Sequence, residues 1–193
     1  PDKHKFPMKK YSELAKRLVE QNIFNHSNFF VPDILDEKIL YLTHNSDYIE
    51  RAKTLTLEKV EARRLGFPQS KELYERELRI AYGTLFGAEI ALTNGLTFNI
   101  AGGTHHAFSN KGEGFCMFND VAVSANYLLN KEHIRKALVI DLDVHQGNGT
   151  AEICANNPNI FTFSVHGKNN YPLKKEISDI DIELEDLTGD EEY

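Results

Sequence analysis

The apolar positions in the first half of the chain follow helical spacing. Over residues 8–21, apolar side chains recur every three or four positions and alternate with lysine and glutamate. This pattern predicts a surface helix packed on a core. Similar spacing predicts helices over residues 47–57, with Ser46 as the N-cap, and over residues 70–92.

The second half alternates short apolar runs with helical segments. We predict strands over residues 96–101, 137–143 and 160–165, and helices over 121–129 and 150–155. This order indicates βαβ units and a parallel sheet covered by helices on both faces. Because no repeat, low-complexity segment or linker interrupts the chain, we expect residues 1–193 to form a single domain.

Composition restricts the class of protein. With 193 residues, 41% of them hydrophobic, the chain can bury a sizeable core. A net charge of -7 disfavours a protein that binds nucleic acid through its phosphates. The sequence contains no signal peptide and no apolar run that could span a bilayer, so we expect a cytoplasmic protein without a membrane partner.

Three potential metal ligands stand at the end of the apolar run that begins at Ala137. Asp141, Asp143 and His145 occupy alternate positions, so their side chains would project from one face of an extended segment. A catalytic zinc ion takes three protein ligands and a water molecule, whose pKa it lowers. Asp143 and His145 could supply two of these ligands.

A tandem histidine pair follows the strand predicted at 96–101. His105 and His106 come directly after Gly102, Gly103 and Thr104. The carboxyl ends of parallel strands share one edge of a sheet, so we expect these histidines to lie near Asp141. Imidazole can accept the proton of a water molecule, and a carboxylate such as Asp141 can hold its tautomer.

Other histidines and cysteines lack such a context. An Asp-x-Asp pair at a strand end is often only a loop start or helix cap, and a His-His pair alone is a weaker signal of a metal site; finding both in one parallel-sheet domain favours the metal site. We expect the remaining residues of these types to be surface, structural or buried groups: His4, His26, His44, His133, Cys116 and Cys154.

Four segments resemble, in the same order and at similar spacing, the signatures of zinc-dependent histone deacetylases. They are Gly102-Gly-Thr-His-His-Ala107, Gly112-Glu-Gly-Phe-Cys116, Phe118-Asn-Asp120 and Asp141-Leu-Asp-Val-His-Gln-Gly-Asn-Gly149. The resemblance runs from His4 to the end of the chain. Gln146, Asn148 and the Tyr171-Pro172 region are most similar to the class IV branch and its bacterial relatives.

The resemblance implies a three-layer α/β/α fold of the arginase/deacetylase type, with a mainly parallel sheet, incomplete at both ends. The implied reaction is removal of acetyl or other acyl groups from an amine such as lysine. Asp143 and His145 match zinc ligands, and His105 and His106 match the proton-handling pair, with His106 as general base. Asp141 matches the residue that orients His105.

The resemblance also implies a structural monovalent cation, usually potassium. Asn148 matches the partner of His106, and an amide there should stabilise the imidazolium less than a carboxylate would. The remaining matches have two roles: for the cation, Asp141, Asp143, His145, Ser164 and Val165; for the walls of the substrate channel, Gly114, Phe115 and Tyr171.

Two parts of the implied site are missing from the sequence. The third zinc ligand, an Asp, and the Tyr that would bind the substrate carbonyl are expected beyond Tyr193. Thr188 and Glu191 have capping-box spacing, which predicts a helix cut off at its start. We therefore expect a fragment of a longer protein, inactive and of low stability alone. The late acidic residues are expected in an exposed segment: Asp179, Asp181, Asp186 and Asp190.

Two alternatives remain open. A two-manganese ureohydrolase shares the implied fold, although it usually draws its ligands from an Asp-x-His-x-Asp order. A non-catalytic binding module could also retain the fold and its cation. The sequence selects neither the substrate among acylated amines, from protein acyl-lysine to small metabolites, nor an oligomeric state.

Overall fold

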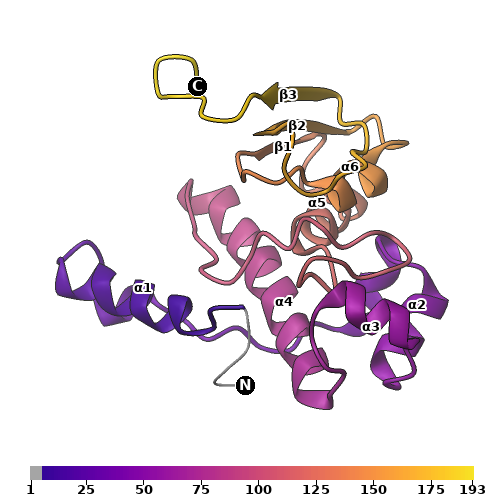
Figure 1. Cartoon of the computed structure of the whole chain (residues 1–193). Coiled ribbons are helices and arrows are strands. Elements are labelled where there is room, and N and C mark those ends of the chain that lie inside the picture. Colours follow the sequence, from indigo (N-terminus) through magenta and orange to yellow (C-terminus); the bar gives the residue numbers. More distant parts are fainter. Residues whose placement is uncertain (1–5) are drawn as a thin grey trace.

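The molecule consists of a group of helices with a small sheet packed at one end (Figure 1). This computed structural model describes residues 6–193. The elements are α1 (Lys9–Glu20), η1 (His26–Asn28), η2 (Glu37–Leu42), α2 (Ser46–Lys53), α3 (Lys59–Leu65), α4 (Lys71–Asn94), α5 (Asp120–Asn130), β1 (Ala137–Asp141), α6 (Asn148–Cys154), β2 (Ile160–Gly167) and β3 (Ile180–Leu184).

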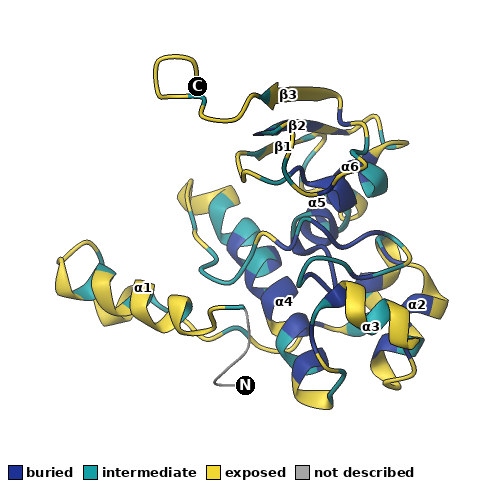
Figure 2. Ribbon diagram, viewed as in Figure 1, coloured by how far each residue is buried: buried dark blue, intermediate teal, exposed yellow. Residues whose placement is uncertain are grey.

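Helices α4 and α5 form the centre of the helical part, where buried residues concentrate (Figure 2). The Ser70 hydroxyl caps α4 by accepting from the backbone N–H of Leu73. Tyr48 of α2, Leu78 of α4 and Phe118 are almost completely buried in one apolar cluster. This core supports the loops that precede α5.

Helix α2 departs from the prediction at both ends. The N-cap is Asn45 and Ser46 is the first helical residue, so Ser46 is not the cap. The helix ends at Lys53, because Leu55 adopts a positive φ of 60° that turns the chain. Helix α3, the 3-10 helices and strand β3 were not predicted, since short elements leave little periodicity in a sequence.

The three strands form one parallel sheet in the order β1-β2-β3. Asp141 at the end of β1 pairs with Ser164 of β2, which in turn pairs with Asp181 of β3. Strand β1 ends at Asp141, so the predicted strand over 137–143 is two residues too long. The parallel sheet itself is confirmed.

The prediction of a strand over residues 96–101 is wrong. This segment follows α4 and bonds to it through side chains, with Thr97 donating to the carbonyl of Gly87 and Asn99 to that of Ile80. Leu96 and Phe98 point outward, 69% and 70% exposed. A strand requires a hydrogen-bonding neighbour, and within residues 6–193 the sheet offers none to this segment.

Helices cover one face of the sheet, whereas the prediction had both faces covered. Apolar residues of α5 and α6, including Ala122 and Cys154, pack against Ile160. The opposite face carries large apolar side chains that are 42–61% exposed: Leu138, Ile140, Phe161, Ile180 and Ile182. The described part of the chain therefore contains two of the three predicted layers.

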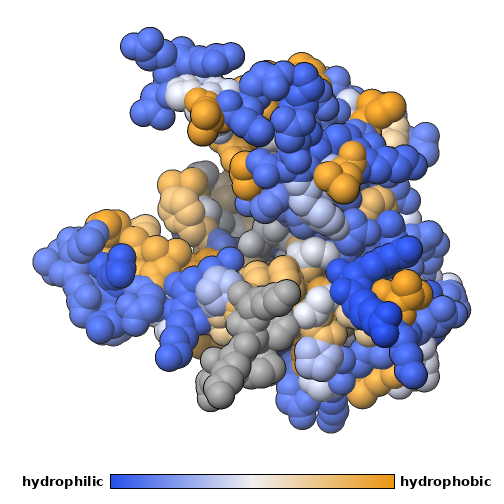
Figure 3. Space-filling view, viewed as in Figure 1, coloured by the Kyte–Doolittle hydropathy of each residue, from blue (hydrophilic) through white to orange (hydrophobic). Residues whose placement is uncertain are grey.

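Helix α1 extends away from the rest of the molecule (Figure 1). None of its residues is buried, so the prediction that it packs on a core is wrong. Its apolar positions form hydrophobic surface at the left of Figure 3. Near its start, Tyr11 contacts Phe6, with ring centroids 6.1 Å apart.

The chain end also differs from expectation. The Thr188 hydroxyl donates to the carbonyl of Glu185, so the predicted capping box is wrong, and residues 188–193 form turns in which the N–H of Tyr193 bonds to the carbonyl of Gly189. Among the described residues, no helix has the length and apolar character needed to cross a membrane.

Candidate functional site

A cavity of about 440 Å³ brings together most of the site residues predicted from the sequence. It lies where the loop before α5 meets the segment that follows β1. The predicted residues that line it are His105, His106, Gly114, Phe115, Asp143, His145 and Tyr171.

The buried carboxylate of Asp120 positions the tandem histidine loop. It accepts hydrogen bonds from the backbone N–H groups of Gly103 (3.0 Å) and Thr104 (2.7 Å) and from the Thr104 hydroxyl (2.6 Å). A Cβ on Gly102 would lie only 2.7 Å from Asp120 Oδ2, which explains the glycine. Asp120 belongs to one of the four motifs, but no local sequence pattern indicated this role.

His105 is paired with a carboxylate. Its Nδ1 lies 2.6 Å from Asp141 Oδ2 at the end of β1. Burial opposes protonation, but the hydrogen bond and the charge of Asp141 outweigh it, so the pKa of His105 is raised. The predicted orienting partner therefore lies in contact with its histidine.

His106 is paired with an amide. Its Nδ1 lies 2.7 Å from Oδ1 of Asn148, the first residue of α6. Burial, reinforced by the neighbouring His105, lowers the pKa of His106 to about 4. The two imidazole centroids are 4.1 Å apart, so adjacent rings differ in their affinity for a proton.

Asp143 and His145 lie beyond the end of β1, in the turn that leads to α6. The prediction that they share a strand face with Asp141 is therefore wrong, although both still line the cavity. Asp143 Oδ1 accepts from the backbone N–H of His145 at 2.8 Å and lies 3.0 Å from its Nδ1. Their side chains are half exposed, which leaves them accessible to a ligand.

A carboxylate and an imidazole are suitable ligands for zinc. Within residues 6–193, however, no group of three or more His, Cys, Asp or Glu side chains is placed to hold a metal ion. The pair Asp143 and His145 fits part of a zinc site and lacks a third protein ligand among these residues.

The structure places two of the five residues assigned to a monovalent cation around one small space. A second cavity of about 10 Å³ is lined by Asp141 and Ser164 and not by Asp143, His145 or Val165. The Ser164 hydroxyl is also 2.9 Å from Nδ1 of His166. The cation site remains a prediction.

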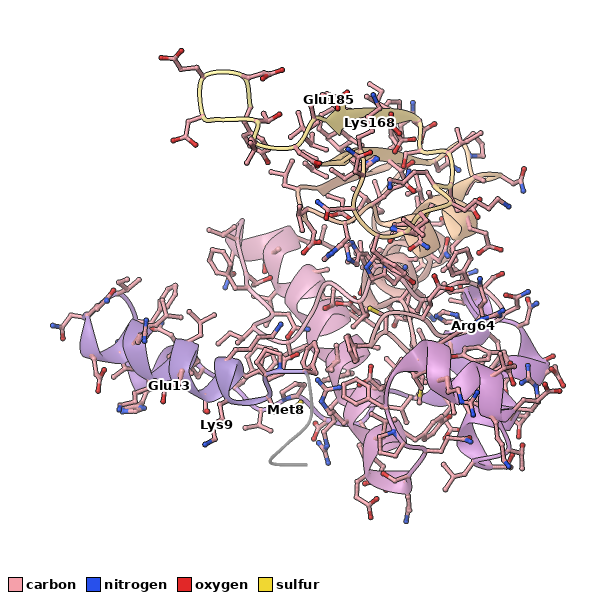
Figure 4. The ribbon with its side chains drawn as sticks, viewed as in Figure 1. Met8, Lys9, Glu13, Arg64, Lys168 and Glu185 are labelled. Atoms are coloured by element: carbon pink, nitrogen blue, oxygen red, sulfur yellow. The ribbon has the colours of Figure 1, made fainter. Side chains whose placement is uncertain are left out.

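Gly114, Phe115 and Tyr171 form walls of the main cavity. The end of α3, where Figure 4 labels Arg64, supports the first two: the N–H of Gly114 bonds to the carbonyl of Arg64, and that of Phe115 to the carbonyl of Leu65. Gly114 has a φ of +56°, and a Cβ there would lie 2.7 Å from the ring of His106. The Tyr171 ring packs against His106 with centroids 5.0 Å apart.

The site contains a carboxylate, Glu113, that the sequence did not predict in addition to those of Asp141 and Asp143. Glu113 accepts hydrogen bonds from the Tyr171 hydroxyl, from Lys111 Nζ at 3.1 Å and from Asn148 Nδ2 at 3.5 Å. Burial opposes ionisation of Glu113, but these donors keep its pKa below the usual value. Its place inside the Gly112–Cys116 motif was the available signal.

The cavity also extends to residues outside the four motifs. Phe6, Lys10, Tyr11 and Arg76 line it on the side of α1 and α4. Arg76 is paired with the buried Glu77. Burial raises the pKa of Glu77 to about 7, against the effect of Arg76.

The histidines that we expected at the surface or in structural positions lie there, as far as the structure describes them. His44 is buried, with Nδ1 2.9 Å from the carbonyl of Phe108 and Nε2 accepting from the N–H of Asn119. His26 and His133 are exposed, and His4 lies outside the described residues.

Both cysteines are free and buried, as predicted. Burial raises the pKa of Cys154 to about 12 and that of Cys116 further, so neither thiol is a ready nucleophile.

The late acidic residues are exposed, as predicted, and two of them also make hydrogen bonds at the sheet. Asp179 and Asp181 lie at the sheet, where Asp179 accepts from the N–H and hydroxyl of Thr162. Asp181 accepts from the Gln146 amide and the N–H of Ser178. Neither lines the main cavity.

The whole chain is similar to one family of proteins. The model of the histone deacetylase domain matches residues 4–193. A curated protein of Picosynechococcus sp. is 39% identical over 193 residues, which is 100% of this chain and 64% of that protein. The acetoin utilization protein AcuC of Staphylococcus aureus is 30% identical over 176 residues, covering 86% of this chain and 45% of AcuC.

Solved structures share the fold. The crystal structure of an HDAC homologue from Aquifex aeolicus superposes with a TM-score of 0.80 at 23% identity, covering 96% of this chain and 55% of that one. A structure of an HDAC homologue complexed with SAHA gives the same values. The chain thus spans between 45% and 64% of the length of these relatives.

Proposed function

Because the chain belongs to the histone deacetylase domain family, we propose that it forms part of a zinc-dependent deacylase. The proposed reaction is hydrolysis of an amide that joins an acyl group to an amine such as lysine. The observation that carries the proposal is that the pairs His105–Asp141 and His106–Asn148 adjoin the same cavity as Asp143 and His145.

Asp143 and His145 would hold the zinc ion, with a third ligand supplied from outside these 193 residues. Zinc, when bound, would make a water molecule acidic and polarise the substrate carbonyl. Asp141 and Ser164, which line a second small cavity, would contribute to a structural potassium site together with Asp143, His145 and Val165.

His106 is suited to act as the general base. Its pKa, lowered to about 4, keeps the ring neutral near neutral pH. With the Nδ1 proton donated to Asn148 Oδ1, the lone pair of Nε2 is free to accept the proton of water. His105, beside the Asp141 carboxylate, would retain its proton more readily. It would then stabilise the negative charge that develops on the substrate.

The walls of the cavity suit a slender substrate. Phe115 and Tyr171 supply aromatic surface, and Gly114 lets the backbone approach closely. Acyl-lysine on a protein and small acylated amines share this shape. SAHA, present in the structure of a similar HDAC homologue, is a suitable first ligand to test.

The experiment is hydrolysis of an acetyl-lysine peptide by the full-length protein, with metal analysis of the same sample. We expect turnover that SAHA inhibits and one zinc ion per chain. Two manganese ions per chain would instead indicate the ureohydrolase alternative. A folded protein that binds neither metal nor SAHA would contradict the proposal and indicate a non-catalytic module.

A further inference from the structure

Glu113 receives three hydrogen bonds, and each comes from a different part of the site. Tyr171 belongs to the loop after β2, Lys111 to the turn before Glu113, and Asn148 to the start of α6. The Glu113 side chain is 16% exposed. This carboxylate is connected to His106 through the side chain of Asn148.

These contacts fix the direction of the Asn148 amide. An ionised carboxylate only accepts hydrogen bonds, so the NH₂ group of Asn148 must face Glu113. The carbonyl oxygen of Asn148 must then face His106, where it can only accept. His106 therefore carries its proton on Nδ1, which leaves Nε2 unprotonated.

We propose that Glu113 is a positioning residue that sets the tautomer of His106 through the amide of Asn148. Without an acceptor at position 113, the Asn148 amide could rotate and present NH₂ to His106, which would favour the opposite tautomer. His106 would then hold its proton on Nε2 and could not take one from water there.

The Glu113 carboxylate also brings a negative charge to the His106 network, which the neutral amide of Asn148 does not supply. His105 contacts the Asp141 carboxylate directly, whereas the nearest carboxylate along the His106 network is Glu113, one amide further away. Lys111 and Tyr171 keep that carboxylate ionised. A second carboxylate at position 148 would lie beside Glu113 without a donor between them and would be repelled by it.

The tautomer is measured on the full-length protein labelled with ¹⁵N-histidine, by long-range ¹H–¹⁵N NMR in the metal-free state. We expect the Nδ1–H form of His106 in the wild type and in Glu113→Gln, whose Oε1 still accepts from Asn148. Glu113→Ala should give a mixture or the Nε2–H form. The matched control is Glu185→Ala, which removes a glutamate that is paired with Lys168 at 2.6 Å (labelled in Figure 4); neither residue lines the cavity.

A kinetic arm rests on the proposed function. Glu113→Ala should lower kcat about 10- to 100-fold with little change in KM, and Glu113→Gln should restore most of it. Asn148→Asp should reduce kcat more in the wild type than in the Glu113→Gln background, because only the former brings two carboxylates together.

The two arms fail separately. An Nδ1–H tautomer that persists in Glu113→Ala would overturn the role of Glu113, whether or not the protein hydrolyses amides. An inactive wild type that shows the expected tautomer change would refute the proposed function and leave the positioning role standing.

Discussion

Nδ1 of His105 lies 2.6 Å from Oδ2 of Asp141. The next residue, His106, makes the equivalent contact to the neutral amide of Asn148. The first contact raises the pKa of His105, whereas burial and the neighbouring ring lower that of His106 to about 4. Two adjacent imidazoles thus differ in how readily they hold a second proton, and this difference supports separate roles for them.

His106→Ala in the full-length protein should reduce hydrolysis of an acetyl-lysine peptide by at least about 100-fold, since a general base contributes on that scale. Zinc content should not change, because His106 is not among the proposed ligands. Steady-state kinetics and metal analysis on the same preparation provide the test. Activity within a few-fold of wild type would rule out His106 as the base.

The 193-residue chain should bind zinc much more weakly than the full-length protein. Asp143 and His145 supply two ligands, and residues 6–193 place no third nearby. Isothermal titration calorimetry with Zn²⁺ on both proteins measures the difference. Equal affinities would mean that the third ligand lies within this chain.

Gly114→Ala should destabilise the site in two ways. The φ of +56° costs a side chain about 1–2 kcal/mol, and the new Cβ would press on the His106 ring, 2.7 Å away. We expect both lower stability in urea and lower kcat. The matched control is Gly95→Ala, where φ is +88° and nothing lies within 4 Å, so only stability should fall.

Asp120→Asn should loosen the tandem histidine loop. The substitution replaces one of the two carboxylate oxygens with an NH₂ group, so the N–H of either Gly103 or Thr104 loses its acceptor and faces a second donor. We expect a loss of about 3 kcal/mol in the free energy of unfolding. Urea denaturation measures it, and a change below about 0.5 kcal/mol would contradict the anchoring role.

Stability should decrease as pH falls below about 6.5, with His44 as one cause. Burial lowers the pKa of His44 from 6.5 to about 4, so between these values the unfolded chain binds a proton at His44 that the folded chain excludes. The difference corresponds to about 3 kcal/mol, fully lost below the folded-state pKa.

The His44 contribution is isolated by substitution. Urea denaturation near neutral pH and again in mild acid, between the two pKa values, should show a smaller pH effect in His44→Gln than in wild type. The same change at the exposed His133 should leave the pH effect as it is. An equal pH effect in His44→Gln and wild type would exclude His44 as a cause.

Local sequence determined the chemistry that the chain carries. The positions of His105 and His106 after a glycine pair and of Asp143 and His145 after an apolar strand were visible without a structure. The central helices and two parallel strands were also predictable, because the period of apolar residues depends on local backbone geometry. The family resemblance rested on the same local motifs.

Tertiary structure alone decided how those groups interact. Glu113 acts with Asn148, 35 residues away in sequence, and Asp120 with Thr104, so no local pattern could pair them. Whether residues 96–101 form a strand depended on a hydrogen-bonding neighbour, and their hydrogen bonds go to α4 instead. The covering of the sheet likewise depended on tertiary structure, since a residue pattern specifies which faces of a strand are apolar but not what packs on them.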